Sequence, residues 1–195
     1  MHFQVDNLYH IYNQGNNKQI VFFSRDNYLF FLKKVKQHIL PYADVLAWCL
    51  MPNHFHLLIA TKLKEVLQEK SIELKNLNHS IGTMLSSYTR AINLQEGRSG
   101  SLFRKGCKAE CVTKIDGVSP SYFNSQFGAI INRTLSEFDY PQVCFDYIHE
   151  NPVKGGLVES KEEWEFSSYL DYAEIRNGTL VEKDKCGDFN IIFQK

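Results

Sequence analysis

The sequence Cys49-Leu50-Met51-Pro52-Asn53-His54-Phe55-His56-Leu57-Leu58-Ile59-Ala60 combines a turn, two histidines and an apolar run, and our prediction of the fold starts here. Leu57–Ala60 is short and wholly apolar, which indicates a buried β-strand. Strand side chains alternate between faces, so a strand beginning by His54 puts His54 and His56 on one face and Phe55 on the other. Two imidazoles on one rigid strand form half of a site for a divalent metal ion. Alternatively, one or both are ordinary core or surface histidines beside a turn.

The segments around this strand predict the other elements of an α+β fold. Leu8–Asn13 is rich in aromatic and β-branched residues and indicates a first strand. Asp44–Leu50 indicates a second strand, joined to the histidine strand by a tight connection. Apolar residues at three- and four-residue steps predict two amphipathic helices, one after a capping Ser24 and one over Leu74–Leu94. A fourth strand is expected after the basic segment Gly100–Val112.

The order strand, helix, strand, strand, helix, strand predicts a ferredoxin-like fold, in which a βαββαβ chain forms one antiparallel sheet. Helices would cover one face of the sheet and leave the other face for His54 and His56. We expect residues 1–195 to form a single domain, with a core at about 8–158 and a C-terminal tail at about 159–195. The tail is rich in aromatic residues, so we expect it to fold back on the core.

Two further helices are expected between the fourth strand and the tail. Ser119-Pro120 is typical of a helix start, and the apolar spacing that follows predicts a helix to about Phe138. The segment 116–140 is longer than a simple connector, and its role stays open. Val143–Glu150 predicts the second helix, which Asn151-Pro152 would stop.

This last helix supplies the other half of the candidate site. Tyr147 and Asn151 are four residues apart, so on a helix their side chains point the same way, with Glu150 near that face. A tyrosine beside a metal ion can act as a covalent nucleophile. Asn151 can offer its side-chain oxygen to the metal. Alternatively, the tyrosine packs in the core and the asparagine caps the helix end before a proline.

The net charge excludes a general electrostatic attraction to nucleic acid, because 22 Lys and Arg residues balance 22 Asp and Glu residues. Phosphate binding must therefore come from local clusters. The segment Gly100–Val112 contains the densest basic patch, and we expect phosphate contacts from Arg98, Arg104, Lys105 and Lys108, around the turn at Gly97–Gly100. Alternatively, they form an ordinary solvated loop.

No apolar run approaches the roughly 18 residues of a membrane span, and the first residues lack the features of a signal peptide. Five cysteines without a Cys-x-x-Cys pair indicate reduced thiols, so we expect a cytoplasmic protein. Cys107 and Cys111 match no strong zinc pattern.

Five segments of the chain form a combined pattern that extends from about Tyr9 to Tyr172. They are Tyr9–Asn17, Met51–Leu58, Ser99–Phe103, Tyr147–Val153 and Trp164–Tyr169. Together they resemble the single-tyrosine HUH transposases, and most closely the REP-associated tyrosine transposases. The His-bulky-His strand and the tyrosine before Asn-Pro-Val are specific in combination, and the other segments support them.

The resemblance implies an enzyme in which His54, His56 and Asn151 bind a Mg²⁺ or Mn²⁺ ion. Tyr147 would attack a phosphodiester of single-stranded DNA, giving a 5′-phosphotyrosine link and a free 3′-hydroxyl. A later attack by another 3′-hydroxyl would rejoin the strands. The implied partner is single-stranded DNA with a hairpin, and the implied form is a monomer or homodimer in a bacterial cytoplasm.

Two other functions stay open from the residues alone. In a metal-dependent phosphodiester hydrolase, His54, His56 and a carboxylate such as Glu150 would activate water. In a catalytically silent nucleic-acid-binding module, the sheet would bind DNA without any reaction. Histidine is a softer ligand than Mg²⁺ usually takes, so we expect weak metal binding and better activity with Mn²⁺.

Overall fold

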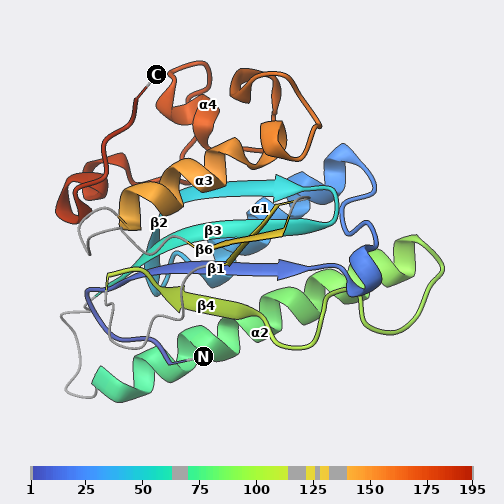
Figure 1. Cartoon of the computed structure of the whole chain (residues 1–195). Helices are drawn as coiled ribbons and strands as arrows, with labels where there is room; N and C mark the ends of the chain where they lie inside the picture. Colours follow the sequence, from blue (N-terminus) through green and yellow to red (C-terminus); the bar gives the residue numbers. More distant parts are fainter. Residues whose placement is uncertain (1, 63–69, 114–121, 126–127, 132–139, 195) are drawn as a thin grey trace.

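The computed structural model describes residues 2–62, 70–113, 122–125, 128–131 and 140–194. Its centre is a four-stranded antiparallel sheet with the strand order β2-β3-β1-β4 (Figure 1). The strands are β1 (Leu8–Gln14), β2 (Ala43–Met51), β3 (His54–Thr61) and β4 (Lys108–Cys111). Together with the intervening helices, this order confirms the predicted ferredoxin-like α+β fold. The fourth strand lies within the basic segment, not after it.

Helices lie on both faces of the sheet. Helices α1 (Arg25–His38) and α2 (Lys70–Gln95) pack against one face, where their apolar side chains join those of β1 and β3 in one buried cluster. Helix α3 (Tyr140–Lys154) runs along β2 in Figure 1 and packs on the other face in a second cluster. The face expected to be open is therefore partly covered, because Phe145 and Ile148 of α3 are buried against it.

Strand β3 shows why the two faces differ. Phe55, Leu57 and Ile59 belong to the cluster under α1 and α2, and the intervening Leu58 and Ala60 belong to the cluster under α3. This alternation is the period of two expected for a strand. Burying each large apolar side chain contributes about 1.5–3 kcal/mol, so slipping the register by one residue would be costly.

The start of α1 follows from its capping residues. Ser24 precedes the helix in an extended conformation, as predicted for an N-cap. The side-chain oxygen of Asn27, three residues on, accepts a hydrogen bond from the Ser24 backbone N–H at 3.2 Å. Phe31 and Val35 then follow on the buried side of the helix. A capping arrangement of this kind contributes about 1 kcal/mol.

The helix predicted from Ser119 to about Phe138 is wrong where the structure describes that segment. Strands β5 (Tyr122–Ser125) and β6 (Gly128–Ile131) pair antiparallel there, and the rest of the predicted helix lies outside the described residues. The apolar residues form two short runs, each rich in aromatic or β-branched residues, which favour strands. A glycine between the runs suits a hairpin better than a helix interior.

Helix α3 also differs from the prediction, because it continues through Asn151 and Pro152 to Lys154. A proline lacks the N–H that would bond to the carbonyl four residues earlier. The loss is limited here because Pro152 lies in the last turn. Beyond it, Gly155 donates its N–H to the Asn151 carbonyl at 2.8 Å, which closes the helix end. Asn151 is therefore held in helical geometry.

The C-terminal tail folds back on the core, as predicted, and pairs with the outer edge of β2. Leu50 donates its N–H to the Phe166 carbonyl, and Ser168 donates its N–H to the Trp48 carbonyl, each at 2.9 Å. Further along, Val181 forms a bridge with β2. The tail contains η2 (Lys161–Glu163), α4 (Tyr169–Tyr172) and η3 (Lys183–Phe189). The edge of β2 is thus paired and shielded from other chains.

Within the described part of the chain, no helix combines the length and the apolar composition that crossing a membrane requires.

Candidate active site

The two histidines of β3 share the face of the sheet that α3 covers. The centroids of the His54 and His56 rings are 5.0 Å apart, and the ring planes are nearly perpendicular at 87°. His56 is buried and His54 is partly buried. The rigid strand thus holds two imidazoles side by side, in the arrangement that the spacing predicted.

A third histidine, which our sequence analysis gave no role, completes the cluster. His10 lies on β1, and its Nε2 is 2.8 Å from Nδ1 of His56. The two rings are stacked, with centroids 5.0 Å apart and planes inclined by 24°. The alternation of β1 places His10 on the face shared with Leu8. This alternation can be read from the sequence, but the contact also needs the β1–β3 register, which pairs Tyr12 with His56.

The structure brings Tyr147 of α3 to the same place. The centroid of its ring is 5.4 Å from that of His56 and 6.2 Å from that of His10, both in edge-on arrangements. Residues from β1, β3 and α3 therefore meet above the sheet. The phenol and the imidazole pair come from one chain, so a single copy contains all of these groups.

Asn151 lies one helical turn after Tyr147 and is also buried. Its Nδ2 donates a hydrogen bond to the Tyr147 carbonyl at 2.9 Å, which fixes the orientation of the amide. The side chain also interacts with both neighbouring groups. It offsets part of the burial effect that lowers the pKa of His54, and part of the burial effect that raises the pKa of Tyr147.

Burial keeps the imidazoles neutral. Desolvation lowers the pKa of His10 to about 3. The pKa of His56 lies well below its ordinary value because of desolvation and because protonated His10 and His54 would repel its charge. A neutral imidazole has a nitrogen lone pair available for a metal ion. The electrostatics of the cluster therefore suit a ligand role better than an ion-pair role.

The donor atoms fit a divalent metal ion. The Nε2 atom of His56 is buried and has no hydrogen-bond partner among the described residues, which is costly unless another group binds it. His54 Nδ1 lies 2.6 Å from Asn53 Oδ1, which leaves the other ring nitrogen of His54 for a ligand. The described residues contain no group of three or more His, Cys, Asp and Glu suited to a metal. A third donor must therefore come from elsewhere, and Asn151 is the adjacent candidate.

Glu150 is engaged outside this cluster. One of its carboxylate oxygens is 2.6 Å from Lys154 Nζ, and both side chains are substantially exposed. The same Nζ lies 5.8 Å from the centroid of the Tyr147 ring. In this arrangement Glu150 pairs with a lysine, and Lys154 places a positive charge beside the phenol.

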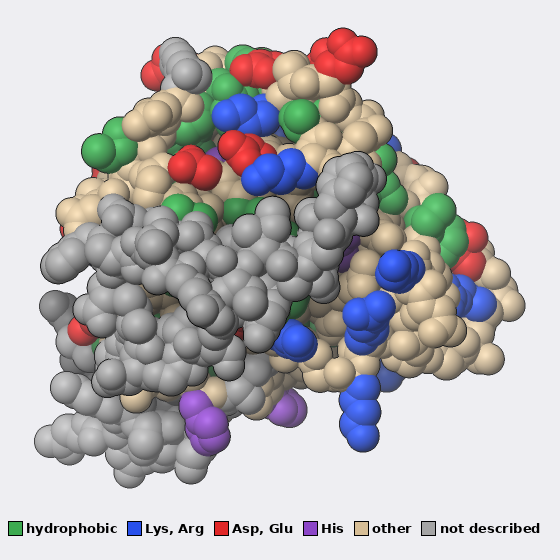
Figure 2. All heavy atoms as spheres, in the orientation of Figure 1, with side chains coloured by type: hydrophobic (Ala, Val, Ile, Leu, Met, Phe, Trp, Pro, Cys, Tyr) green, Lys and Arg blue, Asp and Glu red, His purple; other side chains and the backbone are tan. Residues whose placement is uncertain are grey.

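The four predicted phosphate contacts lie along the segment between α2 and the start of β4. Arg98 donates a hydrogen bond to the side chain of Gln19 at 2.8 Å, which ties this segment to η1 (Asn16–Lys18). Arg104 and Lys105 are exposed. Lys108 begins β4, and its Nζ lies 5.9 Å from the Tyr12 ring, whose centroid is 5.9 Å from His56. Figure 2 shows Lys and Arg side chains gathered on the side where these loops lie.

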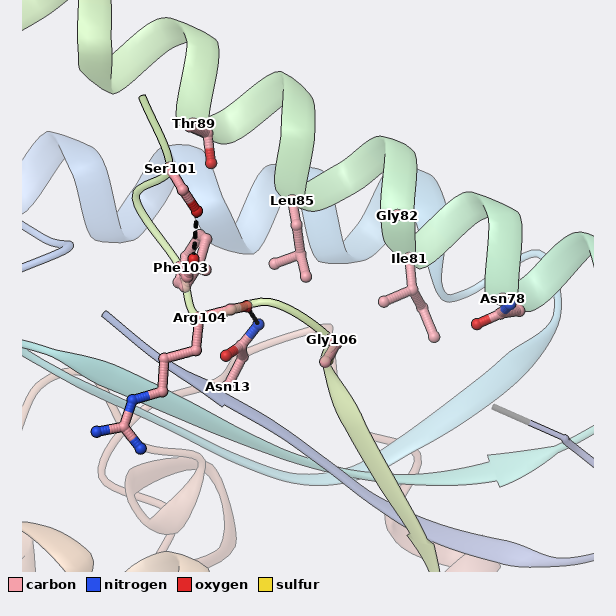
Figure 3. Close-up of a pocket in the computed structure, with 11 residues that line it drawn as sticks. Asn13, Asn78, Ile81, Gly82, Leu85, Thr89, Ser101, Phe103, Arg104 and Gly106 are labelled. Carbon is pink, nitrogen blue, oxygen red and sulfur yellow. Dashed lines mark hydrogen bonds between the residues drawn. The ribbon is translucent and has the colours of Figure 1, made fainter. Parts of the chain in front are cut away.

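A cavity of about 470 Å³ lies between α2 and the segment that leads to β4 (Figure 3). Its lining residues are Asn13, Asn78, Ile81, Gly82, Leu85, Thr89, Ser101, Phe103, Arg104, Gly106 and Cys107. Ser101 and Asn13 donate hydrogen bonds to the carbonyls of Phe103 and Arg104, respectively. The cavity shares Arg104 with the basic segment but has no contact with His54, His56 or Tyr147, so it is separate from the histidine cluster.

Comparisons with known proteins support the fold. No family model matches the chain, and no curated protein matches it. Among solved structures, the chain is similar to a REP-associated tyrosine transposase bound to a REP hairpin. The match has a TM-score of 0.50 and 17% sequence identity, and it covers 93% of this chain and 91% of the other. The two chains thus have related folds over nearly their whole lengths.

Proposed function

We propose that this protein is a metal-dependent transposase that cleaves and joins single-stranded DNA through Tyr147. The observation that carries the proposal is the approach of the Tyr147 ring to His56, at 5.4 Å between centroids. A partly buried phenol beside an imidazole cluster is the pairing that a tyrosine nucleophile needs. The related fold of the hairpin-bound transposase supports this proposal, as does the resemblance of five segments of the sequence to the REP-associated tyrosine transposases.

In the proposed cleavage step, the Tyr147 oxygen attacks the phosphorus atom of a phosphodiester. A new bond forms between phosphorus and the phenol oxygen, and the bond from phosphorus to the 3′-oxygen breaks. The phenol proton passes to water, and the departing 3′-oxygen takes up a proton to become a hydroxyl. The 5′-phosphate stays attached to Tyr147. Attack by another 3′-hydroxyl reverses the exchange and joins new ends without an external energy source.

The residues around Tyr147 have distinct parts in this step. Burial raises the pKa of Tyr147, so the phenol is protonated before the reaction. A side-chain hydrogen bond from Asn151 to the phenol lowers the pKa of Tyr147 against the effect of burial and so favours the phenolate as it forms. These groups are placed before the substrate arrives, so they need no rearrangement during the reaction.

In this proposal His54, His56 and Asn151 hold a Mg²⁺ or Mn²⁺ ion. Such an ion offsets the negative charge that develops on the phosphate oxygens. The two imidazoles favour Mn²⁺ over Mg²⁺, so weak Mg²⁺ binding is expected. Glu150 is not needed as a ligand, since it is paired with Lys154.

The proposed substrate is single-stranded DNA with a hairpin, and its backbone would contact Arg98, Arg104, Lys105 and Lys108. Of these, Lys108 is the nearest to the histidine cluster through a described contact: its Nζ lies 5.9 Å from the centroid of the Tyr12 ring, which lies 5.9 Å from that of His56. A DNA strand that runs along the basic segment toward Tyr12 would therefore approach Tyr147. Because one chain supplies both the phenol and the imidazoles, a monomer contains the proposed site, and a homodimer is not required for it.

The test is incubation of the protein with hairpin-containing single-stranded DNA and Mn²⁺, followed by denaturing electrophoresis. The parent protein should form a covalent protein–DNA band, and Tyr147→Phe should abolish both the band and cleavage. Tyr169→Phe is the matched control, because the Tyr169 hydroxyl bonds to Glu162, away from the cluster. It should leave the band unchanged.

The two alternatives give different results in the same assay. A hydrolase would continue to cleave DNA after Tyr147→Phe. A silent binding module would bind DNA equally with and without Mn²⁺ and would never form the band. Either result would refute the transposase proposal.

A further inference from the structure

The contact between His10 and His56 has a direction that decides whether His56 can bind a metal ion. A neutral imidazole carries one N–H and one lone pair, so one ring donates the proton in this contact and the other accepts it. The two nitrogens are 2.8 Å apart, which is hydrogen-bonding distance. Both rings are buried, with exposures of 7% for His10 and 6% for His56.

Only one direction leaves a lone pair on the free nitrogen of His56. If His56 Nδ1–H donates to His10 Nε2, then His56 Nε2 has a lone pair for the metal. In the reverse direction, His56 Nε2 carries the proton and becomes a buried donor that lacks a partner among the described residues. Such an unpaired buried donor destabilises the fold, and the site loses a ligand.

His54 is held in a comparable way by its neighbour Asn53. The amide oxygen of Asn53 accepts a hydrogen bond from His54 Nδ1 at 2.6 Å, because an amide oxygen cannot donate. This contact leaves the lone pair of His54 on Nε2. Each histidine of β3 thus has a hydrogen-bonding group beside its Nδ1 atom, and the group beside His56 comes from a different strand.

We propose that His10 is a positioning residue whose Nε2 accepts the hydrogen bond of His56 Nδ1–H and thereby fixes the metal-binding tautomer of His56. This inference rests on the metal site of the proposed function but not on the DNA reaction. Groups that orient metal-binding histidines are normally carboxylates, carbonyls or water. An imidazole has the same effect here only in the tautomer with its own proton on Nδ1.

The first test measures binding of Mn²⁺ alone, without DNA, by electron paramagnetic resonance titration. Loss of an orienting group typically weakens metal binding by about 10–100-fold, and His10→Leu should raise the Kd by this factor. His10→Gln offers an amide oxygen near the position of Nε2 and should retain most of the affinity. Tyr12→Phe is the matched control, since Tyr12 lies against the same rings but bonds to Glu110. It should bind Mn²⁺ like the parent.

Two results obtained with the variants in this titration would overturn the assignment. One is a His10→Leu variant that is folded and binds Mn²⁺ as tightly as the parent. The other is equal weakening by leucine and glutamine, which would indicate a packing role. A parent protein that does not bind Mn²⁺ at all would also overturn it.

A second measurement needs no variant and stays valid if His10→Leu fails to fold. Long-range ¹⁵N–¹H spectra of the Mg²⁺-loaded parent protein report which ring nitrogen of each histidine carries a proton. The proton of His56 should be on Nδ1, and a proton on Nε2 would overturn the assignment. If the titration and the spectra agree with expectation but no protein–DNA band forms, the transposase proposal fails and the assignment of His10 stands.

Discussion

The two faces of the sheet are built from the same strands, yet they bury different chemistry. Under α1 and α2, Phe31 packs against Phe22, Phe55 and Tyr88 with ring centroids 4.9–5.3 Å apart. Under α3, the apolar cluster gives way to His10 and His56, whose charged forms are strongly disfavoured by burial.

This difference indicates that the two faces of the sheet have different roles. Each aromatic contact on the first face stabilises the folded state. Each face contains a buried side-chain nitrogen without a partner among the described residues, Trp48 Nε1 on the first and His56 Nε2 on the second, and each costs free energy. Only the imidazole nitrogen has a lone pair for a metal ion, because an indole N–H can only donate. Violations of this kind are typical of functional sites, where the remaining structure compensates for them. We therefore expect stability to depend mainly on the first face and chemistry on the second.

The largest expected effect is on the aromatic face. Phe31→Ala leaves a cavity among fully buried rings and should reduce the free energy of unfolding by about 3–5 kcal/mol. Urea denaturation followed by circular dichroism measures this change. Lys33→Ala, on the exposed side of the same helix, is the control and should change stability by less than about 0.5 kcal/mol. A loss below 1 kcal/mol for Phe31→Ala would contradict the division between the faces.

Metal binding at the second face should increase the stability of the folded protein. At a free Mn²⁺ concentration of 100 times its Kd, binding to the folded state alone raises the free energy of unfolding by about 2.7 kcal/mol. His56→Ala should eliminate this gain, whereas Lys33→Ala should preserve it. Urea titrations with Mn²⁺ and with a chelator measure both. Equal gains in parent and His56→Ala proteins would place the metal elsewhere.

Alkaline pH should reduce the contribution of Tyr28, on the aromatic face, to the free energy of unfolding. Burial raises the pKa of Tyr28 to about 12, whereas an unfolded tyrosine has a pKa of about 10. Only the unfolded chain ionises this group between these values, so its contribution is intact below pH 10 and is lost as pH rises toward 12. The change in the free energy of unfolding caused by Tyr28→Phe should thus be about 1.4 kcal/mol more favourable at pH 11 than at pH 7. Denaturation at the two pH values measures this, and an equal effect at both would refute it.

The smallest expected effect is on the basic segment. Lys105→Ala should weaken DNA binding similarly for all sequences and reduce the slope of log K against log salt concentration by about 0.7–1. Fluorescence anisotropy at several salt concentrations measures the slope. Lys33→Ala again serves as the control. An unchanged slope for Lys105→Ala would indicate a solvated loop without phosphate contacts.

The sequence patterns correctly predicted the features that depend on the geometry of a single helix or strand. The alternation of β3 and the spacing of Tyr147 and Asn151 are properties of single elements, and both agree with the structure. The contact of His10 with His56 depends on a strand register between residues 46 positions apart, which one sequence does not specify. The hairpin of β5 and β6 was missed because short apolar runs fit helical and strand periods alike. Helix α3 extends past Pro152 against the local preference of the residue before a proline, and both Asn151 and Pro152 are buried there.

The pairing of the tail with β2 has a consequence for shortened forms of the chain. A protein ending before Trp164 would expose the N–H of Leu50 and the carbonyl of Trp48 on a strand whose side chains are nearly all buried. Such an edge offers a template to any extended peptide, including a second truncated copy. Shortened proteins would then be able to pair through this edge, so the tail from Trp164 onward protects the sheet against self-association.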